Sequence, residues 1–391
     1  MSETQNLFQS PSALALAEEL TQTLTSNNQL SLISEHRKKG FDPELVTFAL
    51  NQARFRQRGR AKFGENSEKM LFTEAGLEQA TRSQVAAWHA SRFENAGISS
   101  ITDLGAGIGA DSIAFAAAGL AVTAIENHPE SFQALTRNLE PFSNATAIHA
   151  NAEDHPIDSD ALWLDPARRD QDRKSLSVSR LEPEMFSPSL NFVFDKARNQ
   201  PTGIKLAPGF PHELIPSDFE ANWVSHDGDL VELSLWSKPL GEPGLKKAVM
   251  IREEVIQFEG ADESVELRPL GQFVYEPDVS LIRSHLLGAF ANRNKLTLIS
   301  EGIAYLSSDE HKSDPWFKGY KVIETLPLDV KQIKKYCREN DIGILEIKKR
   351  GVDITPEALR PKLGLKGAGV ATLILTKVGN ARQAIVCESI R

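Results

Sequence analysis

The sequence predicts an α/β fold, in which a parallel, doubly wound sheet follows a helical N-terminal region and precedes an α+β C-terminal module. Three observations support this prediction. An apolar segment at residues 101–104 runs into a turn with glycines at positions 105, 107 and 109, and an Ala-rich segment typical of a helix follows. A second apolar segment, residues 121–125, ends on an acid, Glu126. Helical segments separate these early strands, which is typical of a parallel sheet.

Residues 1–92 are predicted to be helical. Residues 13–20 and 43–54 place apolar side chains at the three- and four-residue spacing of an amphipathic helix. Basic residues occupy alternate positions from Arg54 to Lys62, and on a helix this spacing spreads charge around more than one face.

Residues 93–240 are predicted to form the complete sheet, closed by an antiparallel hairpin. The hairpin pairs residues 222–226 with residues 230–236, because apolar residues alternate on both sides of the turn Asp227-Gly228-Asp229. The expected parallel strands are residues 98–104, 121–126, 144–150, 161–164 and 203–207.

The glycine turn and Glu126 together predict a site for an adenosine-containing cofactor. Glycines let the backbone approach the ligand, and an acid after the second strand accepts hydrogen bonds from ribose hydroxyls. The spacing of Gly105, Gly107 and Gly109 also satisfies the loose dinucleotide pattern, so the glycines alone leave NAD open. Asp103 favours a different cofactor, because a carboxylate before the turn could reach the amino end of a methionine moiety but would repel a pyrophosphate.

Three motifs in this order resemble the class I S-adenosylmethionine (SAM)-dependent methyltransferases. Residues 103–109 match the first motif of that family, Glu126 its ribose-binding acid, and residues 165–168, Asp-Pro-Ala-Arg, its fourth motif. The resemblance implies a Rossmann-like sheet with SAM as the cofactor, and it accounts for the closing hairpin, which a dehydrogenase would not need. The cofactor-binding residues that it implies are Asp103, Gly105, Gly107, Gly109, Asp111, Glu126, Asn151, Gln79 and Thr81.

Several of these residues are assigned by position. Gln79 and Thr81 lie before the first strand, in the segment that closes over the methionine end of the cofactor in many class I methyltransferases; a helix cap explains Thr81 nearly as well. Asn151 follows the third strand, where the family usually has an Asp near the adenine. Glu153 and Asp154 are neighbouring alternatives.

The candidate catalytic residues are Asp165, Pro166 and Arg168, at the end of the fourth strand. Asp-Pro would place a carboxylate and rigid backbone carbonyls beside the methyl group, where an acceptor must be aligned and, where necessary, deprotonated. In related amino-directed enzymes an aromatic residue closes this motif and stacks the acceptor base. Arg168 stands there instead, which does not favour N6-adenine chemistry.

Two further residues are candidates for substrate binding. Arg169, with Arg168, could hold a phosphate, although a salt-bridged loop is an equal alternative. Lys205 ends the fifth strand and faces the crevice in which open α/β sheets bind ligands; a strand-end surface lysine is the alternative.

The chain changes pattern after a Pro/Gly linker at residues 239–244. The later part resembles the THUMP-like domain at the C-terminus of a bacterial class I methyltransferase family, and residues 61–64, 71–81 and 275–279 extend this resemblance. We therefore expect a helical region at 1–92, a methyltransferase domain at 93–240, a small α+β connecting region at 241–317 and a THUMP-like domain at 318–391. The expected elements after the linker are strands at 248–251 and 254–258, a helix at 278–287, a strand at 320–324, a helix at 330–340, a strand at 343–348, a helix at 355–363, and strands at 370–376 and 383–387.

RNA is the expected partner, on two grounds. THUMP domains proper are associated with RNA modification, so the resemblance implies RNA. The net charge is −9, yet residues 36–62 carry eight Lys and Arg against two acids, and residues 311–391 carry sixteen against nine. Basic ends suit a polyanion, because phosphate neutralisation drives nucleic-acid binding; solvated basic faces are the simpler alternative.

Composition narrows the class of protein. At 391 residues, with 41% hydrophobic and 25% charged residues, the chain is typical of a multidomain globular enzyme. It starts without a secretory signal pattern, and its longest apolar stretch, near residues 113–122, is too short to span a bilayer. Cys337 and Cys387 suggest neither a disulfide framework nor a metal cluster. We expect a cytoplasmic protein with no membrane or metal partner, and the oligomeric state is open.

These observations favour a SAM-dependent methyltransferase that modifies an RNA base. The first alternative is a methyltransferase of the same fold that acts on a protein or a small molecule. The second is a non-catalytic RNA-binding protein that retains a SAM pocket, and an NAD-dependent dehydrogenase ranks third.

Overall fold

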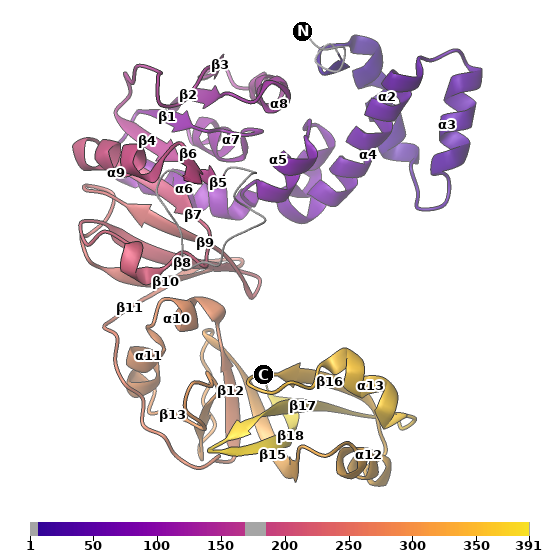
Figure 1. Ribbon diagram of the computed structural model, residues 1–391, viewed down its shortest axis with the longest axis vertical. Coiled ribbons are helices and arrows are strands. Elements are labelled where there is room, and N and C mark those ends of the chain that lie inside the picture. Colours follow the sequence, from indigo (N-terminus) through magenta and orange to yellow (C-terminus); the bar gives the residue numbers. More distant parts are fainter. Residues whose placement is uncertain (1–6, 169–184, 391) are drawn as a thin grey trace. The chain divides into compact units, whose positions relative to one another are not determined.

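The computed structural model describes residues 7–168 and 185–390. The chain divides into two compact units, whose elements are labelled in Figure 1. The first unit comprises Met1–Ala221 and Glu232–Leu245, and the second comprises Asn222–Val231 and Lys246–Arg391. Within the described ranges, no helix is long and apolar enough to cross a membrane.

The first unit begins with helices, as the periodicity predicts. Ser10, Asp42 and Thr73 precede helices α2, α4 and α5, and each side chain accepts a hydrogen bond from a backbone N–H of the first turn, which a helix leaves unpaired. α2 and α4 pack together through buried leucine, valine and alanine side chains. The elements are α2 (Pro11–Thr23), α3 (Gln29–Lys38), α4 (Pro43–Phe63), the 3-10 helix η1 (Gly64–Glu68), α5 (Glu74–Gln79) and α6 (Ser83–Asn95).

The sheet of the first unit has the strand order β9-β7-β4-β1-β2-β3. Its pairs are parallel except β7 with β9, so β9 is the antiparallel strand that the sequence predicts. β2 and β3 lie on one side of β1, and β4 and β7 lie on the other side. This reversal of strand order places a crevice at the carboxyl ends of β1 and β4. The strands are β1 (Ser100–Leu104), β2 (Ala121–Glu126), β3 (Ala145–His149), β4 (Ala161–Leu164), β7 (Thr202–Leu206) and β9 (Asp229–Trp236).

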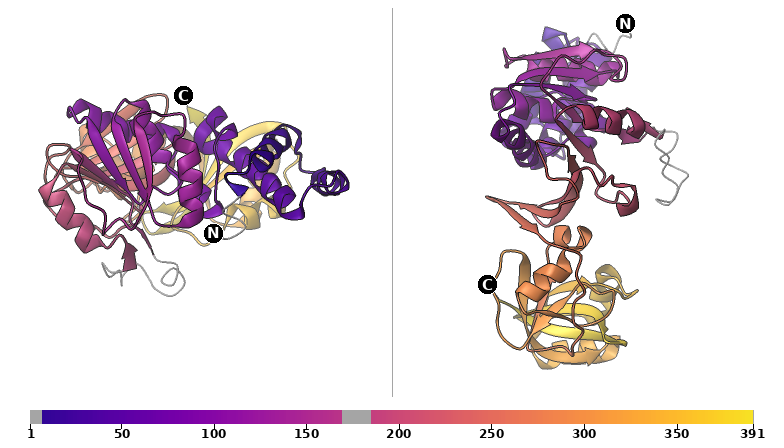
Figure 2. Two further views of the ribbon diagram at one scale, coloured as in Figure 1. Left: turned by 90° about the horizontal axis from the view of Figure 1, so that it is seen from above. Right: turned by 90° about the vertical axis from the view of Figure 1, so that its left-hand side faces the viewer.

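Helices cover both faces of this sheet (Figure 2). α7 contacts α6 and α8 on one face, and α9 packs on the other face against β7. Hydrogen bonds also join the short strands β5 and β6. The remaining elements of this unit are α7 (Ala110–Ala117), α8 (Pro129–Leu139), β5 (Ala167–Arg168), β6 (Phe186–Ser187), α9 (Leu190–Asn199) and the 3-10 helix η4 (His212–Leu214).

Aromatic side chains fill the core beneath the sheet. The rings of Trp163 and Trp236 are fully buried, with centroids 5.6 Å apart, and Phe93 and Phe115 meet Trp163 edge-on. Gly203 of β7 lies against both tryptophans: a Cβ atom there would come within 2.7 Å of each ring. The glycine therefore makes room for the tryptophan pair.

The second unit starts in the closing hairpin. β8 (Glu220–His226) is joined to β9 by a turn in which Asp227 and Gly228 have φ values of 52° and 90°, as a tight hairpin turn requires. β10 (Lys246–Ile251) and β11 (Val255–Glu259) follow, in the order β11-β10-β8. The division between the units falls inside β9.

A seven-stranded sheet forms most of the second unit, in the order β13-β14-β12-β15-β18-β17-β16. Only β16 and β17 are parallel neighbours in this sheet. α12 and α13 pack together, and Ile333, Cys337, Leu359 and Leu363 bury their apolar faces against the sheet. The elements are β12 (Phe273–Pro277), α10 (Val279–Arg283), α11 (Leu287–Arg293), β13 (Thr297–Leu298), β14 (Leu306–Ser308), β15 (Phe317–Pro327), α12 (Val330–Glu339), β16 (Ile342–Lys349), α13 (Pro356–Leu363), β17 (Gly369–Val378) and β18 (Ala381–Ile390).

The second unit differs from the sequence prediction in two places. The single helix expected at residues 278–287 is wrong: α10 ends at Arg283, His285 takes a left-handed conformation with φ 63°, and α11 starts at Leu287. The sheet also contains β12, β13 and β14, which the sequence does not predict. β13 and β14 have only two and three residues, and β12 starts with three apolar or aromatic residues in a row, so none of them shows the alternation that marks a strand. Because β12 pairs with β15, one sheet extends across residue 318, where the sequence predicts a domain boundary.

We predict that Gly203→Ala lowers the free energy of unfolding by about 1–3 kcal/mol, because the new methyl group overpacks a filled core. Urea unfolding followed by tryptophan fluorescence measures the loss. Trp163→Leu in the same chain should relieve part of it, so the double variant should lose less than the sum of the single variants. Additive losses would contradict the steric explanation.

Candidate active site

The glycine turn connects β1 to α7 at the crevice of the sheet. Gly105, Gly107 and Gly109 have φ values of 89°, 57° and 89°, which residues with a Cβ atom rarely adopt. The N–H groups of Gly105 and Ala106 bond to the carbonyl of Ile125, 3.0 and 2.9 Å away, and this ties the turn to β2. The structure therefore gives each glycine the conformation that the motif requires.

Asp103, in β1, is buried with one carboxylate oxygen left free. Its Oδ2 accepts a hydrogen bond of 2.5 Å from the hydroxyl of Ser112, whereas its Oδ1 has no partner among the described residues. Burial, together with the nearby charge of Asp111, raises the pKa of Asp103 well above its usual range. An unpaired buried carboxylate oxygen is costly, and a cationic donor group would remove that cost.

Glu126 ends β2 with its carboxylate held by the backbone. Its Oε2 accepts from the N–H of Gly107 at 2.8 Å, and its Oε1 accepts from the N–H of His128 at 2.6 Å. Burial raises the pKa of Glu126, and these two bonds oppose that rise. Each oxygen keeps a further lone pair, so the oriented carboxylate can still accept hydrogen bonds from hydroxyl groups.

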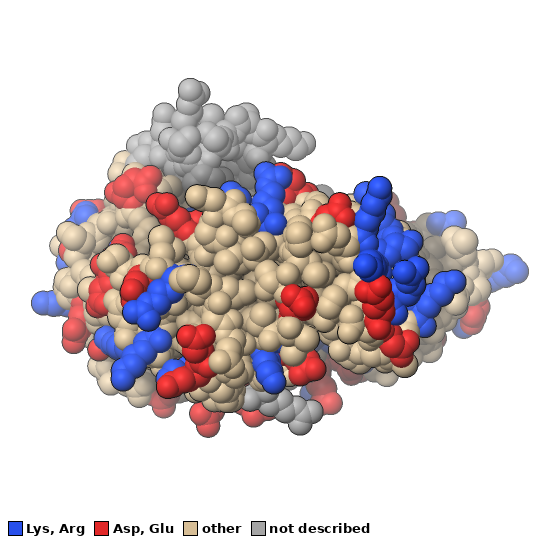
Figure 3. Space-filling model, turned by 90° about the horizontal axis from the view of Figure 1, so that it is seen from below, with Lys and Arg blue, Asp and Glu red and all other residues tan. Residues whose placement is uncertain are grey.

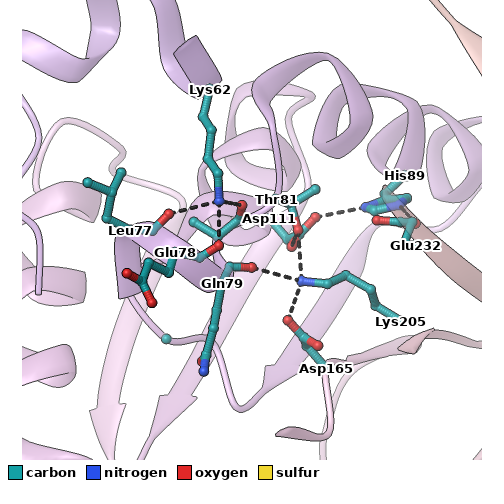
Figure 4. A network of polar contacts seen from close by, with 12 residues as sticks. Lys62, Leu77, Glu78, Gln79, Thr81, His89, Asp111, Asp165, Lys205 and Glu232 are labelled. Carbon is teal, nitrogen blue, oxygen red and sulfur yellow. Dashed lines mark hydrogen bonds and ion pairs between the residues drawn. The ribbon is translucent and has the colours of Figure 1, made fainter. Parts of the chain in front are cut away.

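A buried imidazole joins two carboxylates under the crevice (Figure 4). His89 of α6 has its Nδ1 2.8 Å from Asp111 and its Nε2 2.7 Å from Glu232, and its ring lies 4.3 Å from the Trp163 ring, centroid to centroid. Burial acts to lower the pKa of His89, but the charge of Glu232 and the bonds to both carboxylates outweigh it and raise the pKa to about 9. His89 is thus an imidazolium that donates to both acids.

Asp111 uses both of its oxygens inside the protein. Oδ1 pairs with His89, and Oδ2 accepts the hydroxyl of Thr81 at 2.7 Å. Burial acts to raise the pKa of Asp111, but His89 and Thr81 hold it below its usual value. The structure therefore places Asp111 in the internal network rather than in open contact with the crevice.

Lys205, from β7, connects Asp165 to the segment before β1 (Figure 4). Its Nζ forms a short ion pair with the Oδ2 of Asp165 and lies 3.2 Å from the hydroxyl oxygen of Thr81. The same Nζ lies 3.4 Å from the backbone carbonyl of Gln79, so Gln79 enters the site through its main chain. Burial opposes the charge of Lys205, but Asp165, Asp111 and Glu232 raise its pKa.

Asp165 lies next to the glycine turn, at the end of β4. Its side chain is 32% exposed, and a Cβ atom at Gly105 would come within 3.8 Å of its carbonyl oxygen. Burial raises the pKa of Asp165 while Lys205 lowers it. Pro166 is buried beside it. The side chain of Arg168, and all of Arg169, lie outside the described residues.

The structure places the three adenine candidates after β3 without selecting one. Asn151 is exposed, donates to Asp154 at 2.8 Å and accepts the N–H of Glu153 at 3.3 Å. Glu153 accepts the N–H of Ser189 at 2.7 Å. All three residues therefore take part in local bonds that shape this loop.

Comparisons with known proteins agree with this geometry. A model of THUMP domain-like sequences matches residues 317–389. An uncharacterised SAM-dependent methyltransferase of Mycobacterium tuberculosis, found in two strains, is 28% identical over 335 residues, covering 83% of this chain and 90% of the relative. The crystal structure of a proposed methyltransferase from Porphyromonas gingivalis W83 superimposes with a TM-score of 0.72 at 16% identity, covering 97% of this chain and 98% of that one.

Over most of its length the chain is similar to SAM-dependent methyltransferases, its fold is that of the Porphyromonas structure, and residues 317–389 match the THUMP-like domain. The resemblance inferred from the three motifs is confirmed, and so are the fold and the cofactor. Within the described part of the chain, no group of three or more His, Cys, Asp or Glu residues is arranged to hold a metal ion.

The candidate site contains three residues that the motifs do not reveal. His89 lies on a helix that carries no motif, and Lys62 lies in a run of alternating basic residues in which no sequence feature distinguishes it from its neighbours. Glu232 could have been found from the sequence, because it is a charged residue inside the apolar strand β9. Lys62 donates to the carbonyls of Leu77, Glu78 and Ala80 at 2.7–2.8 Å and so caps α5 next to Gln79 and Thr81.

We predict that the imidazolium of His89 makes the stability of the methyltransferase pH-dependent. A pKa raised from 6.5 to about 9 contributes stability that is fully present below pH 6.5 and is lost as the pH rises through 9. The expected loss is on the order of 3 kcal/mol. Urea unfolding at several pH values between 6 and 10 measures it.

His89→Gln is the comparison variant for this prediction. It should be less stable than the parent at neutral pH, because two buried acids lose their cation, and it should lack the decline that the parent shows near pH 9. The same alkaline decline in both proteins would show that another group causes it.

Proposed function

We propose that the methyltransferase modifies RNA, with Asp103, the Gly105–Gly109 turn and Glu126 holding SAM and with Asp165 and Lys205 receiving the acceptor. The observation that carries the choice of RNA is the THUMP-like domain, which lies on the same chain as the SAM-dependent fold. THUMP domains proper are associated with RNA modification. The basic composition of residues 311–391 supports the same choice.

The cofactor assignment is supported by the chemistry of the donors. Asp103 presents a buried oxygen without a partner, which suits the ammonium group of a methionine moiety. Glu126 presents an oriented carboxylate at the end of β2, where class I folds bind ribose hydroxyls. SAM supplies an activated methyl group, so the protein needs only to align the acceptor and manage its proton.

Asp165 and Lys205 are proposed to act on the acceptor. Lys205 forms an ion pair with Asp165 and opposes the rise that burial gives to the pKa of this carboxyl. A carboxylate can accept a hydrogen bond from an N–H of the acceptor, orient the lone pair of that nitrogen and take up its proton. Thr81 and the carbonyl of Gln79 hold Lys205 in position from the opposite side.

We predict that Glu126→Ala weakens SAM binding by about 1.5–3 kcal/mol, because it removes charge-assisted hydrogen bonds to the ribose. Titration calorimetry measures the affinity. Glu140→Ala is a suitable control, because Glu140 is an exposed acid whose ion pair with Arg137 lies on the surface of α8. Unchanged SAM affinity in the Glu126 variant would contradict the assignment.

We predict that Asp165→Asn lowers the rate of methyl transfer by at least about 10²-fold, as loss of a proton acceptor does, while SAM affinity stays within a few-fold of the parent. Single-turnover transfer and calorimetry on the same preparations separate the two effects. Asp195→Asn, on the exposed side of α9, is the control. If Asp165→Asn abolishes SAM binding, Asp165 contacts the cofactor or maintains the structure instead.

The RNA substrate can be tested with RNA from a strain that lacks the gene. That RNA should accept radiolabelled methyl groups from SAM when the purified protein is added, and RNA from the parent strain should not, because its sites are already methylated. Mass spectrometry of nucleosides then identifies the modified base. Label in protein or small-molecule fractions, with none in either RNA, would overturn the proposal.

A further inference from the structure

Helix α12 of the second unit has two chemically different faces. Ile333 and Cys337 are buried against the sheet. The other face carries Lys331, Lys334, Lys335 and Arg338, all exposed. These positions follow the spacing i, i+3, i+4, i+7, so the four cations form one stripe about 10 Å long. We call these four residues the α12 stripe.

The α12 stripe is almost free of internal partners. Only Lys335 has an acid within ion-pair distance among the described residues: its Nζ lies 3.9 Å from Glu339, and both side chains are exposed. The C-terminal part of α13 adds Lys362, and Lys366 follows it; both are exposed. A Cβ atom at Gly364, between these two lysines, would lie 3.6 Å from the Lys334 ammonium, so the two helices bring their cations together.

Two other basic residues of this unit serve the fold instead. Lys348 lies 2.7 Å from Glu276 and 3.3 Å from Glu346, and the Arg350 guanidinium donates to the carbonyl of Ala304 at 2.8 Å. Figure 3 shows Lys and Arg side chains gathered right of centre, on the side where Figure 1 places α12. The four exposed cations of α12 and the two at the end of α13 form the cluster of positive charge that a ligand could contact, whereas other exposed lysines of this unit lie on separate elements.

The α12 stripe works against the stability of its own helix. Like charges four residues apart, as in Lys331–Lys335 and Lys334–Arg338, repel each other on a helix surface. Lys331 also lies in the first turn, where the helix dipole favours acids. The packing of this unit therefore gives no reason for the stripe, and a bound polyanion would relieve both costs.

We propose that the α12 stripe, extended by Lys362 and Lys366, is the surface on which the RNA substrate docks. The identity of the partner rests on the proposed function, whereas the surface rests on the charges described above. A phosphate backbone offers the row of anions that the stripe would neutralise. A membrane is a poor match, because an amphipathic helix binds a bilayer through its apolar face, and that face of α12 is already buried in the protein core.

The test replaces the four residues of the α12 stripe by glutamine in the full-length chain, because glutamine keeps helix propensity while removing charge. The probe is a fluorescein-labelled pool of unmodified transfer RNA, with binding followed by fluorescence anisotropy at several salt concentrations. Binding should weaken at least about tenfold near 0.1 M salt, and the slope of log affinity against log salt should fall by up to about 3. Circular dichroism and SAM calorimetry should match the parent.

A charge-matched control replaces Lys295, Lys318, Lys321 and Lys349, which are exposed lysines of the same unit outside α12. This control should bind RNA within a few-fold of the parent. Equal weakening in both variants, or none in the stripe variant, would overturn the proposal. So would a parent protein that binds duplex DNA or anionic lipid vesicles and no RNA.

The two proposals fail in different ways. If the stripe variant loses RNA affinity while the parent transfers no methyl group to any RNA, the docking surface stands and the proposed methylation of RNA falls. If the parent methylates RNA and the stripe variant does so with the same KM, methylation stands and the docking surface falls.

Discussion

The protonated imidazole of His89, buried between Asp111 and Glu232, is the interaction on which the rest of the site depends. Burying an ion pair costs solvation free energy, and the attraction between the charges offsets this cost only where they lie close together. His89 satisfies one oxygen of each acid, which frees the second oxygen of Asp111 to hold Thr81. Thr81 in turn lies beside Lys205, so an imidazolium deep in the core sets the position of a cation at the crevice.

The charge balance of the crevice follows from this network. Among the described residues, the cations that pair with or lie near Asp103, Asp111, Asp165 and Glu232 are His89 and Lys205, whose contacts Figure 4 draws. The excess of acid is greatest at Asp103, whose pKa is raised and whose Oδ1 lacks a partner. A cofactor with an ammonium and a sulfonium group carries the charges that this crevice lacks, and it loses the sulfonium charge when the methyl group leaves.

Sequence alone was sufficient for the strands of the first sheet and for the glycine turn, because strands and glycine turns are local patterns. The strand predicted at residues 121–126 is β2 without change. It was insufficient for contacts between distant segments: His89 and Glu232 are 143 positions apart, and no local pattern links them. It was also insufficient for the roles of charged residues. A count of Lys and Arg does not distinguish Lys62, which caps a helix, from Lys331, which is exposed to solvent.

The Asp165–Lys205 pair also bears on which kind of atom can accept the methyl group. Burial raises the pKa of Asp165, and the ion pair with Lys205 opposes that rise without cancelling it, so this carboxylate accepts a proton more readily than an exposed Asp does. Such a carboxylate suits an acceptor that donates an N–H and becomes acidic as it is methylated, since the proton then needs only a modest acceptor. A hydroxyl or a ring carbon would require stronger activation before the methyl group could transfer. On the proposed function, the Asp165–Lys205 pair therefore suits a nitrogen acceptor better than a hydroxyl oxygen or a ring carbon.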